Sequence, residues 1–202
     1  MNRFFDRIFL ILYYLTTCWY YKIIFGELGS RTVIKSTGSR IENPKNIFIG
    51  SKVFIGRYSW LAASPHVSKT PKLIIKDNVS IGRFNQVYSN SEITIENSVL
   101  TADRVYISDG THESKDIDIP IMSQGISSRG PMTIGAGSWI GINACIIGAS
   151  IGKNCVIAAN SVVVKDIPDY CIVGGVPARI IKRYNLKSKN WEQTHEDGSF
   201  KF

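Results

Sequence analysis

The residue of this sequence with the clearest capacity for chemistry is His112. An imidazole can gain or lose a proton near neutral pH, so it can serve as a general base toward a hydroxyl group. The other two histidines are placed differently: His66 lies among Pro and Ser residues, and His195 lies in a polar C-terminal stretch. His112 directly precedes a long irregular segment, where a side chain can leave a packed body and face a ligand. The alternative is that His112 is simply a polar surface residue.

A six-residue repeat of aliphatic side chains runs through the chain and must position this histidine. Six is neither the helical period nor the strand period of two, so each hexad reads as one short strand and a corner. Gly often follows the aliphatic residue and can supply the corner conformation. The repeat predicts a coiled, prism-like parallel sheet with the aliphatic residues inside. These residues are Ile49, Ile55, Leu61, Ile75, Ile81, Val87, Ile95, Ile107, Ile134, Ile140, Ile146, Ile151, Ile157 and Val163.

Departures from the repeat divide the chain. Thr101 replaces an aliphatic residue, and Ile146 is followed by Ile151 after five residues instead of six, which predicts one tightened corner. Segments 62–72 and 113–133 hold Pro, Ser and charged residues and are expected to loop out. We therefore expect one all-β solenoid domain at residues 29–175, a hydrophobic helix at 1–28, and a short helical or polar tail at 176–202.

Charge and cysteine usage exclude some functions. The formal net charge is +8. Nearly all of it lies in residues 1–45 and 179–202, so the solenoid itself is almost neutral, which argues against a nucleic-acid groove. The four cysteines have no metal-ligand spacing, and we expect no metal site. Cysteines without a disulfide pattern favour a reducing, cytoplasmic setting.

Residues 8–21 are uncharged and rich in Tyr and Trp. The run is short for a membrane span of about 20 residues. Its aromatic residues suit the headgroup zone, and Arg3, Arg7 and Lys22 would favour anionic lipid. This predicts peripheral contact with the inner face of the cytoplasmic membrane. The alternative is a helix that caps the open end of the first coil.

Two stretches carry a family resemblance. They are ITIENSVLTADRVYISDGTHE and PMTIGAGSWIGINACIIGASIGKNCVIAANSVVVKDIPDYCIVGGVPARIIK. The sequence resembles the hexapeptide-repeat acyltransferases, in the branch of the maltose, galactoside and polysaccharide O-acetyltransferases. Its opening, IENPKNIFIGSKVFIGRYSWL, looks like members from capsule and O-antigen pathways. The resemblance implies a left-handed parallel β-helix that works as a homotrimer, with acetyl-CoA between neighbouring subunits.

The resemblance also implies roles for single residues. His112 matches the general base of the family, and Trp139, at the same hexad position, could wall the acceptor site or make a trimer contact. Family members more often show Asp-His-x-His where this chain has Asp109-Gly110-Thr111-His112. Asp109 could orient the imidazole or be an exposed turn residue. Asn85 is weighed as an acceptor contact against an internal amide.

Coenzyme contacts follow from matching positions. The resemblance implies that Gly141 and Ile142 lie along the pantetheine arm and Ala159 lies further along the groove. Val164 and Lys165 would lie near the nucleotide. The basic residues Arg179 and Lys182 would meet the phosphates of the coenzyme, unless they belong to a solvated basic tail.

Three functions compete. The first is acetyl transfer to a glycan hydroxyl in surface polysaccharide synthesis, which the membrane-directed N-terminus supports. The second is acetylation of a small amine, an antibiotic or a nucleotide-linked amino sugar on the same fold. A metal hydratase on this fold would need three groove histidines, and only His112 is suitably placed.

Overall fold

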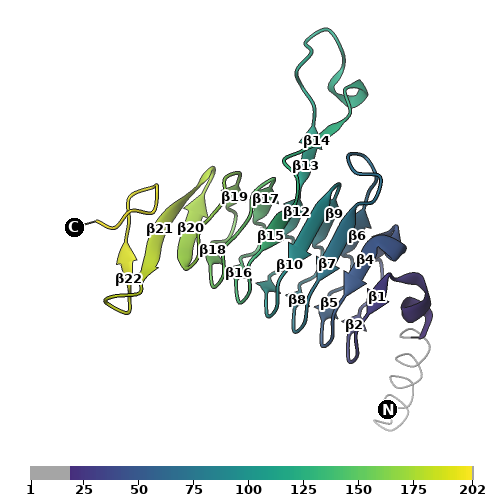
Figure 1. The fold of residues 1–202 in the computed structure, drawn as a ribbon, viewed down its shortest axis with the longest axis horizontal. Coiled ribbons are helices and arrows are strands. Elements are labelled where there is room, and N and C mark those ends of the chain that lie inside the picture. The colour runs from purple at the N-terminus through teal and green to yellow at the C-terminus, as the bar shows by residue number, and fades with distance from the viewer. Residues whose placement is uncertain (1–18, 202) are drawn as a thin grey trace.

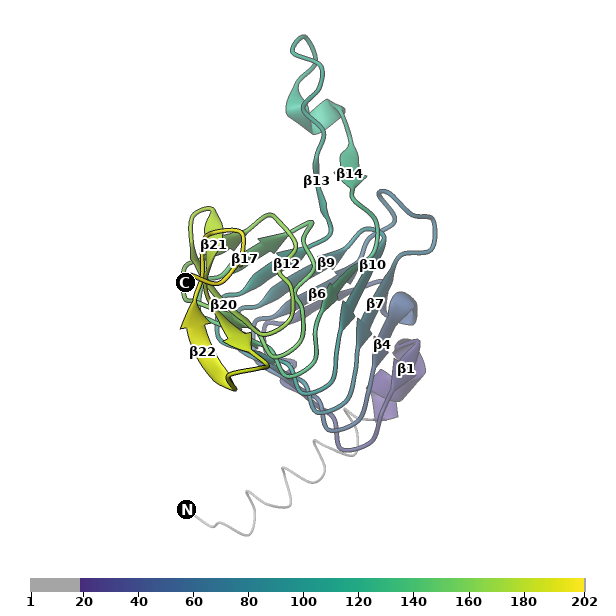
Figure 2. The same cartoon turned by 60° about the vertical axis from the view of Figure 1, so that its left-hand side comes forward.

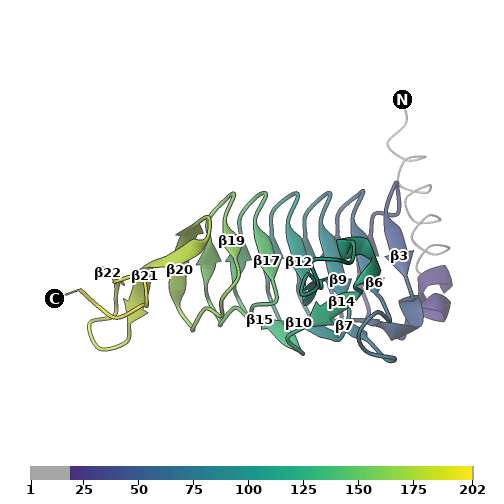
Figure 3. The same ribbon diagram turned by 90° about the horizontal axis from the view of Figure 1, so that it is seen from above.

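The computed structural model describes residues 19–201, which coil into a three-sided prism (Figures 1 and 3). Successive coils add strands to three parallel sheets, and the last two coils join the first of these sheets only through single bridges at Ile151 and Ile167. Sheet A holds β1 (Glu27–Leu28), β4 (Ile47–Ile49), β7 (Lys72–Ile75), β10 (Glu92–Ile95) and β15 (Met132–Ile134). Sheet B begins with β2 (Val33–Ile34), β5 (Phe54–Ile55), β8 (Ser80–Ile81), β11 (Leu100–Thr101), β16 (Trp139–Ile140), β18 (Val156–Ile157) and β20 (Cys171–Gly175). Sheet C holds β3 (Arg40–Glu42), β6 (Trp60–Ala63), β9 (Gln86–Ser89), β12 (Tyr106–Ser108), β17 (Cys145–Ile147) and β19 (Val162–Val163).

The hexad residues fill the shaft of the prism. Equivalent residues stand in register on successive coils, as Ile55 does opposite Ile81 in sheet B. Every aliphatic hexad residue is buried. Each such side chain packs on its equivalent one coil away, about 4.8 Å along the axis. The predicted left-handed parallel β-helix of hexapeptide repeats is therefore confirmed.

Tight corners join the sheets. Asn78, Asn154 and Asn160 adopt the left-handed backbone conformation there, which Asn tolerates better than most residues. Gly56 lies so close to the next coil that a Cβ atom on it would stand 2.5 Å from the carbonyl oxygen of Gly82. The repeated Asn and Gly residues thus allow the coils to stack at sheet spacing.

The N-terminal end differs in part from the expectation of a helix over 1–28. Residues 1–18 lie outside the described part of the chain. Residues 19–24 are helical, but Glu27–Leu28 form strand β1 and pair with β4. Phe25 is buried against the first coil, and Tyr21 and Ile24 pack on the same core. Helical turn and strand together cover the end of the shaft, and no helix in residues 19–201 is long and apolar enough to cross a membrane.

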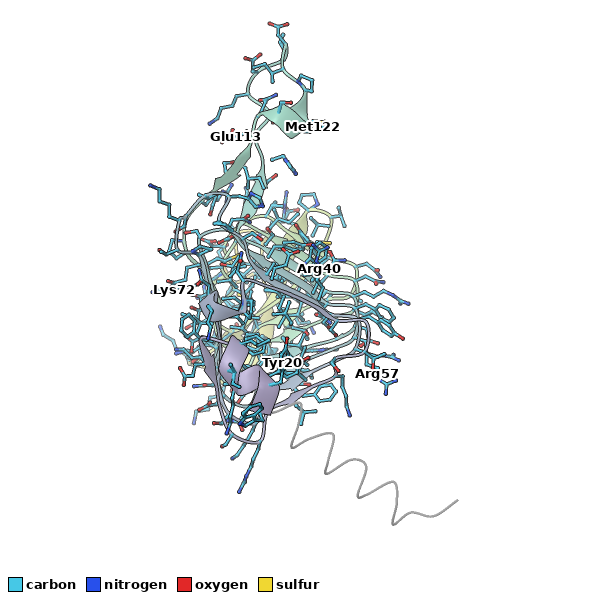
Figure 4. All side chains as sticks on the ribbon, turned by 90° about the vertical axis from the view of Figure 1, so that its right-hand side faces the viewer. Tyr20, Arg40, Arg57, Lys72, Glu113 and Met122 are labelled. Carbon is cyan, nitrogen blue, oxygen red and sulfur yellow. The ribbon has the colours of Figure 1, made fainter. Side chains whose placement is uncertain are left out.

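Two segments leave the prism. Residues 64–71 form a loop between β6 and β7. Residues 110–128 form an arm built on β13 (Gly110–His112) and β14 (Ile126–Ser128), which pair antiparallel (Figure 2). Glu113 and Met122 lie on this arm, well away from the coils (Figure 4). Two 3-10 turns, η1 (Pro44–Asn46) and η2 (Ile121–Ser123), lie before β4 and on the arm.

Of the two alternatives expected for the tail, helical or polar, the helical one is wrong. After β20 the chain turns back as β21 (Ala178–Asn185) and then forms β22 (Asn190–Gln193), both antiparallel to their neighbours in sheet B. Ile180 and Thr194 are buried while most flanking residues are exposed or half-buried. Strand pairing satisfies the backbone groups of β20, which would otherwise form an open sheet edge.

Candidate active site

His112 lies where the chain leaves sheet C and enters the arm. It ends strand β13, opposite Ile126 of β14, and its side chain is exposed. The residue lines a pocket of about 610 Å³ over the outer face of sheet C. This volume is in the range of small-molecule sites. An accessible imidazole at the wall of a pocket has the placement that a general base needs.

Asp109 does not have either position expected for it. The residue is 1% exposed, and its carboxylate turns toward the neighbouring coil. One oxygen accepts hydrogen bonds from the backbone N–H of Asn90 at 2.7 Å and from its side-chain amide at 3.2 Å. The other accepts the backbone N–H of Ser91 at 2.8 Å. Asp109 therefore anchors the base of the arm, and both its role as direct orienter of His112 and its reading as an exposed turn residue are wrong.

Gly110 explains a departure from the family motif. A Cβ atom at this position would lie 2.6 Å from the side-chain nitrogen of Asn90. A larger residue here would displace the amide that donates to Asp109. The absence of a side chain at Gly110 therefore allows Asn90 to keep its hydrogen bond to Asp109.

The expectation that Asn85 holds an acceptor is also wrong. The side chain is fully buried inside the shaft. Its amide donates to the carbonyl oxygens of Arg83 and Ala102, and its oxygen accepts the hydroxyl of Thr101. The non-aliphatic Thr101 thus has a buried polar partner, and the alternative of an internal amide is correct.

Trp139 lies on strand β16, on the outer face of sheet B, and not at a corner. It stands between Leu100 and Val156 of the adjacent coils and is 49% exposed. His112 leaves from sheet C, and Trp139 does not line the pocket beside it. One chain therefore does not bring the two rings together.

Four of the expected coenzyme contacts follow one corner of the prism. Gly141 and Ile142 continue from β16, and Ala159 lies at the equivalent corner of the next coil after β18. A Cβ atom on Gly141 would stand 2.7 Å from the backbone nitrogen of Ala159, so the two corners are in close contact. On the following coil Arg179 of β21 pairs with Gly174 of β20. The four residues form a row that runs toward the C-terminal end.

The other three expected contacts lie apart from this row. Val164 and Lys165 follow β19 at the corner between sheets C and A, where the carbonyl oxygen of Val164 accepts a hydrogen bond from Arg129. Lys182 lies three residues beyond Arg179 along β21, opposite Ile172. Arg179 itself forms an ion pair with Glu196 at 3.0 Å.

Sequence reasoning missed the aromatic side chains of this pocket. Trp60, Tyr88 and Tyr106 line it, and so does His66, which the sequence gave no reason to select. Burial, followed by the charge of Glu42, raises the pKa of Tyr88 to about 12, so its hydroxyl stays protonated. The available signal was the outward position of each ring, next to an inward hexad residue.

Within residues 19–201 no three His, Cys, Asp or Glu side chains come together as a metal site. Cys155 and Cys171 stack in the shaft as free thiols, and the sulfur of Cys155 accepts the backbone N–H of Cys171. Burial raises the pKa of both thiols, that of Cys171 to about 11. These two cysteines are packing residues and not nucleophiles.

Comparison with known proteins places the chain in a family. Residues 131–165 match the family model described as the hexapeptide repeat of succinyl-transferase. The "Galactoside O-acetyltransferase" of Escherichia coli is 30% identical over 160 residues, which cover 76% of this chain and 74% of that protein. This match extends through the repeats on both sides of His112.

Two further relatives match over shorter regions. The "Probable acetyltransferase Rv3034c" of Mycobacterium tuberculosis is 41% identical over 57% of this chain and 38% of its own length. The "Putative lipopolysaccharide biosynthesis O-acetyl transferase WbbJ" of Escherichia coli is 34% identical over 60% of this chain and 65% of its own length. The chain thus spans less than two thirds of either relative.

A solved structure shares the fold. The N-acyltransferase AntD of Bacillus cereus, in complex with dTDP-4-amino-4,6-dideoxyglucose and coenzyme A, superposes with a TM-score of 0.70. It is 24% identical, and the match covers 83% of this chain and 88% of that one. The match to the galactoside enzyme, which covers most of both chains, and the matched hexapeptide repeat show that the chain belongs to the hexapeptide-repeat acyltransferase family.

Proposed function

We propose that the protein transfers an acetyl group from acetyl-CoA to a sugar hydroxyl during the synthesis of bacterial surface polysaccharide, a capsule or an O-antigen. The observation that carries this proposal is His112, exposed at the wall of a pocket and held at the base of the arm by the Asp109 anchor. The relative named for lipopolysaccharide O-acetyl transfer supports the acceptor class.

The reaction is a direct transfer. The oxygen of the sugar hydroxyl attacks the thioester carbonyl carbon, and His112 accepts the hydroxyl proton as it does so. The base is needed because a hydroxyl is too weak an acid to attack unaided. The new C–O bond forms, the C–S bond breaks, and the proton passes to the departing coenzyme thiolate. Negative charge on the carbonyl oxygen needs a hydrogen-bond donor, for which a backbone N–H at a corner is suited.

The distribution of the site residues favours a homotrimer. The row of Gly141, Ile142 and Ala159 lies at the corner between sheets B and C, whereas His112 lies at the corner between sheets C and A. A catalytic site that uses both corners needs two chains. In such an assembly the pantetheine arm lies along the row of one chain, and His112 comes from its neighbour. Trp139 then walls the acceptor site from sheet B.

Labelled acetyl-CoA offered to full-length protein with a panel of lipid-linked and free glycans tests the proposal. Mass spectrometry should find one acetyl group per acceptor, released by mild alkali as an ester is. The alternative is N-acylation of an amino sugar or another small amine, and the fold shared with AntD supports it. An alkali-stable amide product, or transfer to amines alone, would favour this alternative over the O-acetyltransferase.

The coenzyme phosphates are the proposed partners of Arg179 and Lys182. Replacing either by Ala should raise the Kd of acetyl-CoA about tenfold or more, because a charge-assisted hydrogen bond is lost. Acetyl-dephospho-CoA, which lacks the ribose phosphate, should be affected less. Glu196→Gln should tighten the coenzyme, since it releases Arg179 from its ion pair. Calorimetry measures the affinity of these three variants for both ligands. An unchanged Kd of acetyl-CoA in Arg179→Ala and Lys182→Ala would return these residues to the alternative of a solvated basic tail.

Two truncations separate membrane contact from end capping. A chain that starts at residue 19 keeps Phe25 in the core and β1 on β4, so it should stay folded and lose binding to anionic liposomes if residues 1–18 reach the membrane. A chain that starts at Ser30 loses both and should melt at a lower temperature. Sedimentation with liposomes measures the membrane binding of each chain, and thermal melts measure its Tm. If the full-length protein does not bind anionic liposomes, the expected contact with the inner face of the cytoplasmic membrane is wrong.

A further inference from the structure

The pocket beside His112 has a floor of aromatic rings along sheet C. Parallel pairing places Trp60 opposite Gln86, and Gln86 opposite Tyr106, on three successive coils. The ring centroids of Trp60 and Tyr88 are 4.7 Å apart, and those of Tyr88 and Tyr106 are 6.1 Å apart. All three rings line the same pocket, and the transfer chemistry uses none of them.

Small residues flank the central ring of this floor. Tyr88 stands between Ala62 and Ser108 in the same outward row of sheet C. Both small residues are buried, whereas Trp60, Tyr88 and Tyr106 are half-buried and line the pocket. The three rings therefore form the floor of the pocket, and we call this floor the aromatic trough.

Polar groups surround the trough. The guanidinium of Arg40 lies 4.3 Å from the Trp60 ring centroid and pairs with Glu42 at 2.6 Å. Figure 4 places Arg40 between the corner at Arg57 and the base of the arm. Gln86 and His66 add further donors and acceptors. Aromatic faces beside fixed polar groups match a sugar ring, which has apolar C–H faces and a rim of hydroxyl groups.

The length of the trough indicates more than one sugar. It extends from β3 to β12, three strand spacings or about 14 Å. A single hexose ring does not fill that length. His112 lies at the β12 end, so a chain of sugars bound along the rings would present one residue to the base.

We propose that this aromatic trough binds an oligosaccharide of at least two sugar residues and presents one of its hydroxyl groups to His112. Presentation of a hydroxyl group to His112 rests on the proposed acetyl transfer, whereas binding along the trough does not. The expected acceptor is therefore an oligosaccharide or a lipid-linked repeat unit, and not a free monosaccharide.

An immobilised array of bacterial O-antigen and capsule oligosaccharides, printed beside their constituent monosaccharides, tests the trough with full-length protein and no coenzyme. The protein should bind oligosaccharides and not monosaccharides. Trp60→Ala and Tyr106→Ala should each weaken this binding about tenfold or more, as truncation of a central aromatic anchor does. Arg40→Ala, at the exposed end of the trough, should weaken it without affecting the fold.

Tyr58→Ala is the matched control, because Tyr58 is an exposed tyrosine at another corner of the prism and lies outside the pocket. It should leave array binding unchanged. Three results would contradict oligosaccharide binding in the trough. They are unchanged binding by Trp60→Ala, Tyr106→Ala and Arg40→Ala, a preference for monosaccharides, and no binding to any oligosaccharide. Oligosaccharide binding without acetyl transfer would instead overturn the proposed function and leave the trough intact.

Discussion

Replacing His112 by Ala should lower turnover by about 10²- to 10⁴-fold, while the Kd of acetyl-CoA stays within a few-fold. The loss has the size of a general base because only a transition-state interaction disappears. The side chain is exposed at the end of β13, so its removal leaves no cavity in the shaft. Steady-state kinetics with the glycan acceptor and calorimetry with acetyl-CoA measure the two quantities.

Two further experiments make this test specific to His112. His195→Ala removes another exposed histidine, far along the chain, and should leave turnover nearly unchanged. Added imidazole should restore part of the turnover of His112→Ala, because a small base can enter the space left in an open pocket. Turnover that survives the substitution would remove His112 from the mechanism.

Replacing Asp109 by Ala should destabilise the fold and lower turnover together. The carboxylate is buried and accepts three hydrogen bonds from Asn90 and Ser91. Its removal leaves two backbone N–H groups without a partner, at about 1–3 kcal/mol each, so we expect a loss of about 2–6 kcal/mol in the free energy of unfolding. At about 2–4 °C per kcal/mol for a chain of this size, Tm should fall by roughly 4–24 °C. The base of the arm loses its anchor, and His112 moves with it.

Asp77→Ala is the matched control for Asp109. The carboxylate of Asp77 also accepts a backbone N–H from the neighbouring coil, that of Ser51 at 2.7 Å, but at an exposed corner. Solvent can replace it there, so its loss should cost under about 1 kcal/mol. Thermal melts and steady-state kinetics measure the losses of Tm and of turnover in both variants. Similar losses for the two would show that Asp109 is an ordinary corner residue.

The repeat predicted the fold because its signal is local and redundant. Each hexad aliphatic residue needs only its own neighbours to point inward, and stacking then repeats the same contact coil after coil. The tail lacked such a signal. Its β structure depends on antiparallel pairing with β20, and the sequence does not show which edge is available.

The candidate site was predictable only where one residue sufficed. His112 stands out by its type and by the irregular segment that follows it. Asp109 turns inward because backbone N–H groups 18 and 19 residues away point at it, and only the completed coil reveals them. The aromatic trough was missed for a similar reason, since Trp60, Tyr88 and Tyr106 gather only when the residues per coil, loops included, are known.

The antiparallel strands at the C-terminal end have a consequence for assembly. A stack of parallel coils with an open end is a template to which another chain could add indefinitely, as in a fibril. Strands β21 and β22 reverse direction across that end, and the turn between them carries Lys187 and Lys189. A second solenoid would meet antiparallel strands and a positively charged turn there, instead of the edge of a parallel coil. These strands thereby disfavour the end-to-end addition of another chain at this end of the prism.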